Sequence, residues 1–110
     1  MIAATQDRFR GTVQRWTVDT GPHAGTACDY AFNEDWSVAW RVVAGPEQGR
    51  VGRAREFLVQ PLRAQLFLVT FSPADGERIT AAIDFASRRF VSFRGEGDLA
   101  EALSGSFRTI

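Results

Sequence analysis

The sequence predicts an all-β protein, an eight-stranded antiparallel up-and-down barrel with one short helix near the C-terminus. Runs with an apolar residue at every second position alternate with turns rich in Gly, Pro, Asn and Asp. Eight such runs in 110 residues leave about 14 residues for each strand and turn, which favours antiparallel neighbours because parallel crossovers need longer connections. An open meander would expose two long edges, so we expect closure into a barrel that is filled by side chains or holds one small ligand. The alternative is an open, strongly bent sheet with the helix against one face.

Alternating runs define the expected strands in chain order: Phe9–Val18, Thr26–Phe32, Ser37–Val43, Arg53–Val59, Gln65–Phe71, Arg78–Asp84, Arg89–Phe93 and Gly105–Thr109. The helix is expected at Asp98–Leu103, where Asp98 can cap the N-terminus and Gly105 follows the last turn. No repeat, linker or low-complexity segment divides the sequence, so residues 1–110 are expected to form a single domain.

The composition narrows the classes of partner. Thirteen acidic and thirteen basic residues cancel, so no global field favours nucleic acid. A single cysteine excludes an internal disulfide and a multi-cysteine zinc site, and we expect no metal and no cofactor. The first residues lack the apolar run of a signal peptide, and no stretch approaches the roughly 20 apolar residues of a membrane span. We therefore expect a cytoplasmic protein without a membrane partner.

The segment Cys28–Val43 reads as two strands joined by a polar turn at Asn33-Glu34-Asp35. Counting by twos places one set of apolar residues on a common face of each strand: Cys28, Tyr30 and Phe32 on the first, and Trp36, Val38, Trp40 and Val42 on the second. Arg41 then lies on the face opposite the two tryptophans. Its charge must reach water, a buried partner or a ligand, since an unpaired buried charge costs several kcal/mol as a rough estimate.

Several motifs share their order and spacing with a known family: Gly25–Asp35, Val38–Gly45, Gly49-Arg50, Leu66–Phe71, Asp75-Gly76, Ala82–Phe85 and Gly105–Phe107. With these motifs the chain resembles the MoaF-like family, which is named from molybdenum-cofactor biosynthesis gene clusters and belongs to the calycin-like (lipocalin-like) barrels. The resemblance covers most of the chain. It implies a calycin-like barrel.

The same layout is similar to that of the phenolic acid decarboxylases, which are also lipocalin-like barrels. In that family an arginine within an aromatic-Arg-aliphatic strand motif binds the substrate carboxylate, and Arg41 occupies the matching place. The family's catalytic glutamate falls at Ser72-Pro73-Ala74 here, and its two tyrosines fall at Trp16 and Val18. Three of the four functional positions differ, so phenolic acid decarboxylation is not expected.

Three residues are the main candidates for catalytic groups. Arg41 can stabilise the negative charge of an oxyanion. Glu56 or Tyr30 can transfer a proton. For Glu56 this follows because the pKa of a carboxyl group is raised in an apolar cavity. The structural alternative for Arg41 and Glu56 is a salt bridge on the outer face. His23, the only histidine, is a general-base candidate at the barrel mouth or an ordinary loop residue, and Cys28 is expected to be a buried small hydrophobe.

The candidate ligand-binding residues are Arg41 and an aromatic wall of Trp16, Tyr30, Trp36 and Trp40. These aromatic rings can equally fill the interior of a narrow barrel. We expect a small-molecule-binding barrel of the MoaF type that holds a hydrophobic or aromatic ligand. If it is an enzyme, we expect a cofactor-independent lyase, isomerase or cyclase acting by isomerisation, cyclisation or elimination on an enolisable substrate. The alternative is a non-catalytic structural or interaction protein, such as a homodimer with a filled barrel.

Overall fold

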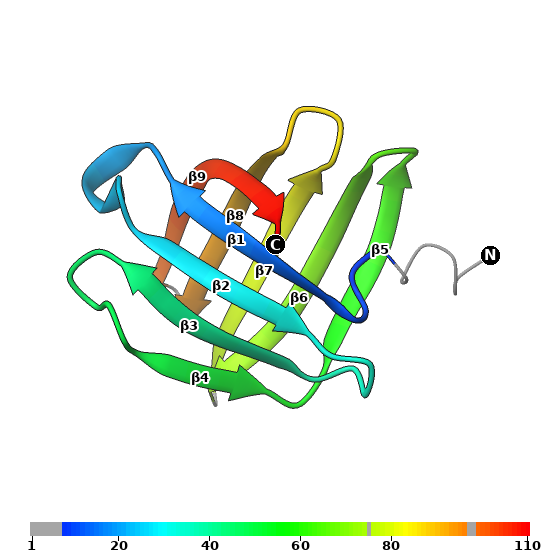
Figure 1. The fold of residues 1–110 in the computed structure, drawn as a ribbon, viewed down its shortest axis with the longest axis horizontal. Coiled ribbons are helices and arrows are strands. Elements are labelled where there is room, and N and C mark those ends of the chain that lie inside the picture. The colour runs from blue at the N-terminus through cyan, green and yellow to red at the C-terminus, as the bar shows by residue number, and fades with distance from the viewer. Residues whose placement is uncertain (1–7, 75, 97–98) are drawn as a thin grey trace.

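The computed structural model describes residues 8–74, 76–96 and 99–110, and in these residues nine β-strands form one sheet (Figure 1). In chain order the strands are β1 (Thr12–Val18), β2 (Ala27–Phe32), β3 (Val38–Ala44), β4 (Val51–Ala54), β5 (Phe57–Arg63), β6 (Leu66–Ala74), β7 (Glu77–Asp84), β8 (Arg89–Glu96) and β9 (Leu99–Thr109). A single 3₁₀ turn, η1 (Gly21–His23), lies between β1 and β2. In the described part of the chain, no helix has the length and apolar composition needed to span a membrane.

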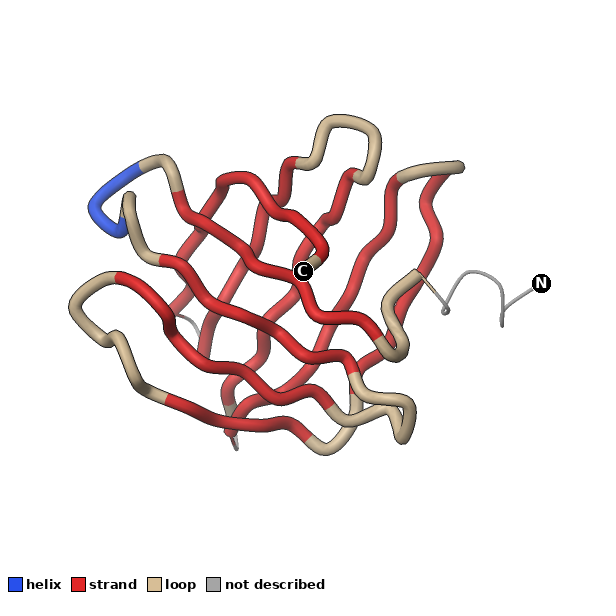
Figure 2. Tube along the Cα trace, in the orientation of Figure 1, coloured by secondary structure: helices blue, strands red, loops and turns tan. Residues whose placement is uncertain are grey.

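All neighbouring strands are antiparallel, and their order is β4-β3-β2-β1-β9-β8-β7-β6-β5. The first and last strands pair from Gln14↔Thr109 to Val18↔Gly105, so the two ends of the chain join the sheet. The open seam lies between β4 and β5, which are consecutive in sequence and lack a hydrogen-bonded ladder. At one end of the seam, the backbone N–H of Phe57 donates to the carbonyl of Trp36 at 2.8 Å. The prediction of an antiparallel up-and-down barrel is therefore confirmed, as a nearly closed barrel (Figure 2).

Two details of the prediction are wrong. The expected strand Arg53–Val59 is two strands, because the chain breaks at Arg55-Glu56. The expected helix at Asp98–Leu103 is the beginning of β9, where Ala102 pairs with Phe93; Asp98 itself lies outside the described residues. A six-residue helix is marginal by itself, whereas β8 offers this segment a continuous ladder of hydrogen bonds.

Gly105 lies where β9 meets β1. A Cβ atom at this position would lie 1.8 Å from the carbonyl oxygen of Thr17, so only glycine allows the two backbones to approach this closely. This close approach completes the wall of the barrel between the two ends of the chain.

One end of the barrel, which we call the closed end, is filled by phenylalanine rings. The rings belong to Phe9, Phe32, Phe57, Phe67, Phe85 and Phe107, and all but Phe85 are buried. Neighbouring pairs have centroids 5.0–5.8 Å apart and interplanar angles of 74–87°, which is the edge-to-face geometry that aromatic rings favour. The closed end is therefore a packed aromatic core.

Candidate functional site

The opposite end, which we call the open end, contains a cavity of about 470 Å³. It lies between β1–β4 on one side and β6–β9 on the other, near the β3–β4 loop and the β6–β7 turn. Its apolar wall includes Trp16, Val18, Tyr30, Trp40, Val42 and Phe90. These residues occupy alternate positions on β1, β2, β3 and β8, so the period of two in the sequence directs them inward.

Aromatic contacts hold this wall in place. The ring of Trp16 lies 4.3 Å from that of Tyr30 and 5.1 Å from that of Phe90, measured between centroids. The indole Nε1 of Trp16 donates a hydrogen bond to Oε1 of the fully buried Gln14 at 3.0 Å. On the same side of the cavity, a Cβ atom added to Gly52 would lie 2.3 Å from the Trp40 ring, so this ring packs directly on the backbone of β4. These contacts therefore define the positions of Trp16 and Trp40 in the cavity wall.

Two neutral polar groups line the cavity beside the aromatic rings. Burial raises the pKa of the Cys28 thiol to about 11, and burial also raises the pKa of the Tyr30 hydroxyl well above its usual value. The positive charge of Arg94 opposes both shifts but does not overcome them. At neutral pH, Tyr30 is therefore a hydrogen-bonding phenol and Cys28 is an unreactive thiol.

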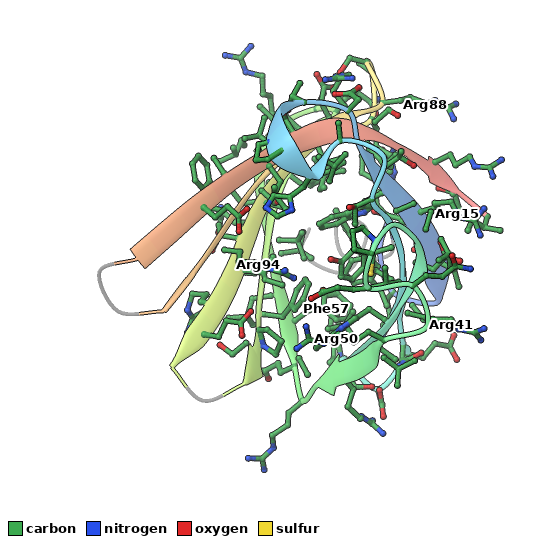
Figure 3. The ribbon with its side chains drawn as sticks, turned by 90° about the vertical axis from the view of Figure 1, so that its left-hand side faces the viewer. Arg15, Arg41, Arg50, Phe57, Arg88 and Arg94 are labelled. Carbon is green, nitrogen blue, oxygen red and sulfur yellow. The ribbon has the colours of Figure 1, made fainter. Side chains whose placement is uncertain are left out.

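Charged side chains lie at the mouth of the cavity. Arg94 of β8 has its Nε 3.8 Å from a carboxylate oxygen of Glu77 of β7. In the β3–β4 loop, Arg50 donates to the Glu47 carboxylate at 3.0 Å. Figure 3 looks into the open end and shows Arg94 and Arg50 within the opening, whereas Arg15, Arg41 and Arg88 lie toward the outside.

The structure places Arg41 on the outer face, exposed and away from the cavity lining. It stands opposite Asp29 in the β2–β3 register, but the Asp29 carboxylate is bound by Arg15 at 2.7 and 3.0 Å. This position follows from strand geometry, because Trp40 and Val42 face inward and the residue between them must face outward. The expectation of a guanidinium inside the barrel therefore does not hold for Arg41.

Glu56 and Trp36 also lie away from the cavity lining. Glu56 is exposed in the β4–β5 connection and borders a separate groove of about 370 Å³ at the seam. Trp36 precedes β3 in the turn after β2, with φ of 73°, and packs on Phe57 at the closed end with a centroid distance of 5.5 Å. The guanidinium of Arg10 lies 5.1 Å from the Trp36 ring. Of the six predicted site residues, the structure therefore brings together Trp16, Tyr30 and Trp40.

His23 forms an exposed ion-pair contact with Glu101 and is not among the residues that line the cavity. Among the residues that the structure describes, no three His, Cys, Asp or Glu side chains lie close enough together to hold a metal ion. Sequence reasoning missed Ser92, Arg94 and Glu77. The sequence contained a signal for two of them, the spacing of two residues between Phe90, Ser92 and Arg94. If the strand is extended beyond Phe93, this spacing directs both Ser92 and Arg94 inward.

Comparison with known proteins places the fold but not the family. No protein-family model matches the chain, and no curated protein matches it. Among solved structures, the chain is similar to "a putative beta-lactamase from Burkholderia vietnamiensis", with a TM-score of 0.79 and 25% sequence identity. The match covers 93% of this chain and 95% of that one. The protein is thus a nearly closed antiparallel β-barrel that resembles this bacterial structure over almost its whole length.

Proposed function

We propose that the protein binds a small aromatic or hydrophobic molecule in the open end of the barrel, as a calycin-like barrel of the MoaF type. The observation that carries this proposal is the aromatic-walled cavity of about 470 Å³. Ligand sites in proteins are typically concave, mostly apolar and supplied with a few polar groups, and their volumes are roughly 300–1,000 Å³. The rings of Trp16, Tyr30 and Trp40 offer stacking surfaces, and the neutral groups of Tyr30 and Cys28 offer polar contacts.

The geometry supports binding better than proton-transfer catalysis. Arg41 and Glu56, which the sequence suggested for oxyanion binding and proton movement, lie outside the cavity. Tyr30 does line it, but its raised pKa disfavours the phenolate that a general base requires. A lyase, isomerase or cyclase built on this cavity would have to use the carboxylates of Glu77 or Glu47 at its mouth.

We do not propose a β-lactamase activity, although the similar bacterial structure carries that name. Serine β-lactamases of the Ser-x-x-Lys type use a lysine beside the nucleophilic serine. All thirteen basic residues of this chain are arginines, so this arrangement is absent from the sequence. Ligand binding needs no such pair of residues and uses the groups that line the cavity.

Tryptophan fluorescence tests the proposal. Trp16 and Trp40 line the cavity, whereas Trp36 packs at the closed end and serves as an internal control. We expect aromatic acids, amides and alcohols of two-ring size to quench the fluorescence saturably. Trp36→Phe should keep the ligand-induced change, and Trp40→Phe should lose much of it. A barrel that is filled in solution, as in the structural homodimer alternative, would give no saturable quenching with any compound of the panel.

A further inference from the structure

We infer that the ligand of this cavity is an aromatic carboxylate, with its ring on the aromatic wall and its carboxylate on Arg94. This inference rests on the proposed function, because it names the chemical class of the molecule that the cavity binds. It assigns Arg94, rather than Arg41, as the residue that selects an anionic ligand.

Arg94 lies at the cavity, where an anionic ligand can reach it. Along β8, Phe90, Ser92 and Arg94 share the inward face and all three line the cavity. The guanidinium lies close enough to the interior for its charge to act on both Tyr30 and Cys28 of the facing strand β2. Its side chain is 42% exposed, so an anion entering from the mouth can reach it without passing through packed side chains. Arg94 thus lies between solvent and the aromatic wall.

The guanidinium of Arg94 is only weakly engaged by other side chains. Its single ion pair is the 3.8 Å contact from Nε to Glu77, and its terminal nitrogens donate no hydrogen bond to any described residue. By contrast, Arg15 donates two hydrogen bonds to the Asp29 carboxylate, and Arg50 donates one to the Glu47 carboxylate at 3.0 Å. A guanidinium presents a planar fork of donors that matches a carboxylate in a bidentate arrangement. In Arg94 this fork remains available to a ligand.

A neutral hydroxyl, that of Ser92, lies on the same inward face of β8 as Arg94. Ser92 is 4% exposed and lines the cavity two residues before Arg94, about 7 Å away along the strand. Its hydroxyl makes no hydrogen bond with the residues that the structure describes. The hydroxyl of a residue that lines the cavity can donate a hydrogen bond to a ligand oxygen. Ser92 and Arg94 together present donors to one end of a ligand whose ring contacts Trp16 and Phe90.

Glu77 competes with such a ligand for Arg94. Its carboxylate is 31% exposed and holds the guanidinium only at 3.8 Å. A ligand carboxylate that binds Arg94 has to approach this charge, so removing it should strengthen the binding of an anion and leave a neutral molecule unaffected. Removing the charge of Glu77 should therefore raise the affinity for an anion, whereas removing the charge of Arg94 should lower it.

Calorimetric titration of the full chain with 1-naphthoate and its neutral analogue 1-naphthamide tests the inference. We expect the unmodified protein to bind naphthoate about tenfold tighter than naphthamide, since hydrogen bonds to charged groups are the stronger ones. Arg94→Met should abolish this preference, because it lowers naphthoate affinity about tenfold and naphthamide affinity much less. The matched control Arg41→Met, on the outer face, should keep the preference. Glu77→Gln should raise naphthoate affinity about threefold, a typical size for removal of a partly exposed like charge.

The outcomes separate the two proposals. Equal binding of both compounds, with Arg94→Met without effect, overturns the carboxylate assignment and leaves ligand binding intact. A preference lost equally in Arg41→Met and Arg94→Met also overturns it, because the effect is then one of overall charge. If neither compound binds, the carboxylate assignment falls, and the fluorescence panel of acids, amides and alcohols decides the proposed function separately. Should Arg94→Met fail to fold, Arg94→Gln and the gain in Glu77→Gln provide the same decision.

Discussion

The two ends of this barrel are built by the same strands and yet differ in what their interiors contain. Along β2, the inward residues change from Cys28 at the open end through Tyr30 to Phe32 at the closed end. At the closed end six phenylalanines meet edge to face, while the open end keeps a cavity of about 470 Å³. The comparison teaches that one alternating pattern can supply both a packed core and a binding cavity, depending on the volume of the inward side chains.

Phe32→Ala and Phe90→Ala compare the ends with the same chemical change. Both side chains are buried, at 1% and 2% exposure, but Phe32 packs among several rings whereas Phe90 borders the cavity. We expect Phe32→Ala to lower the free energy of unfolding by about 4 kcal/mol and Phe90→Ala by about half as much, because part of the Phe90 surface already lacks neighbours. Urea denaturation measures both. Equal losses would mean that the open end is packed as tightly as the closed one.

Gly105→Ala tests whether both ends depend on the junction of β1 and β9. The new Cβ would meet the Thr17 carbonyl oxygen at 1.8 Å, and this oxygen belongs to the backbone and cannot rotate away. We expect a loss of about 3 kcal/mol or more in the free energy of unfolding, together with loss of ligand binding. Thermal denaturation followed by circular dichroism gives the first quantity. A variant as stable as the parent would show that the two strands are not joined as described.

Cys28 reports on the open end through its reactivity. Its pKa is raised from 9.0 to about 11 by burial, so its thiolate fraction at pH 7 is about a hundredfold smaller than that of an unperturbed thiol. We expect alkylation by iodoacetamide to be correspondingly slow at pH 7 and to accelerate about tenfold per pH unit up to about pH 11. A ligand in the cavity should slow the reaction further, as mass spectrometry can measure. Rapid modification at pH 7 would contradict the buried, neutral thiol.

Gly52→Ala should change binding more than stability. The added Cβ would lie 2.3 Å from the Trp40 ring, which is half-buried at the cavity wall and can move. We expect the ring to shift and the affinity for an aromatic ligand to fall about fivefold, which corresponds to about 1 kcal/mol. Calorimetry gives the affinity, and a melting curve should show a smaller change than that of Phe32→Ala. Unchanged affinity would remove Trp40 from the binding surface.

The local pattern was sufficient to predict much of this architecture, because strand alternation is a local property. The inward direction of Tyr30, Trp40 and Val42 follows from counting by twos, and so does the outward direction of Arg41. The pairing of β9 with β8 could not be read in this way, since the segment around Ala102 has helical composition and becomes a strand only through its partner. The break between β4 and β5 likewise depends on the tertiary structure, because these two strands form the unpaired edges of the sheet.

The cavity itself was beyond the reach of sequence reasoning. Its residues come from β1–β4 and from β6–β9, and its volume depends on how side chains from opposite walls fill the space between them. The sequence suggested a cation among aromatic rings but assigned it to Arg41, because that residue interrupts an apolar run. The structure instead places Arg94 at the cavity, two residues beyond Ser92 on the inward face of β8.

The three tryptophan indole groups allow the most direct test of ligand binding at the open end. In a ¹H–¹⁵N NMR titration of the full chain with 1-naphthoate, the indole resonances of Trp16 and Trp40 should shift and saturate together, because both rings line the cavity. The resonance of Trp36, which packs on Phe57 at the closed end, should stay in place. Saturable shifts of Trp36 alone, or no saturable shift of any indole, would contradict the account of an open end that binds an aromatic carboxylate.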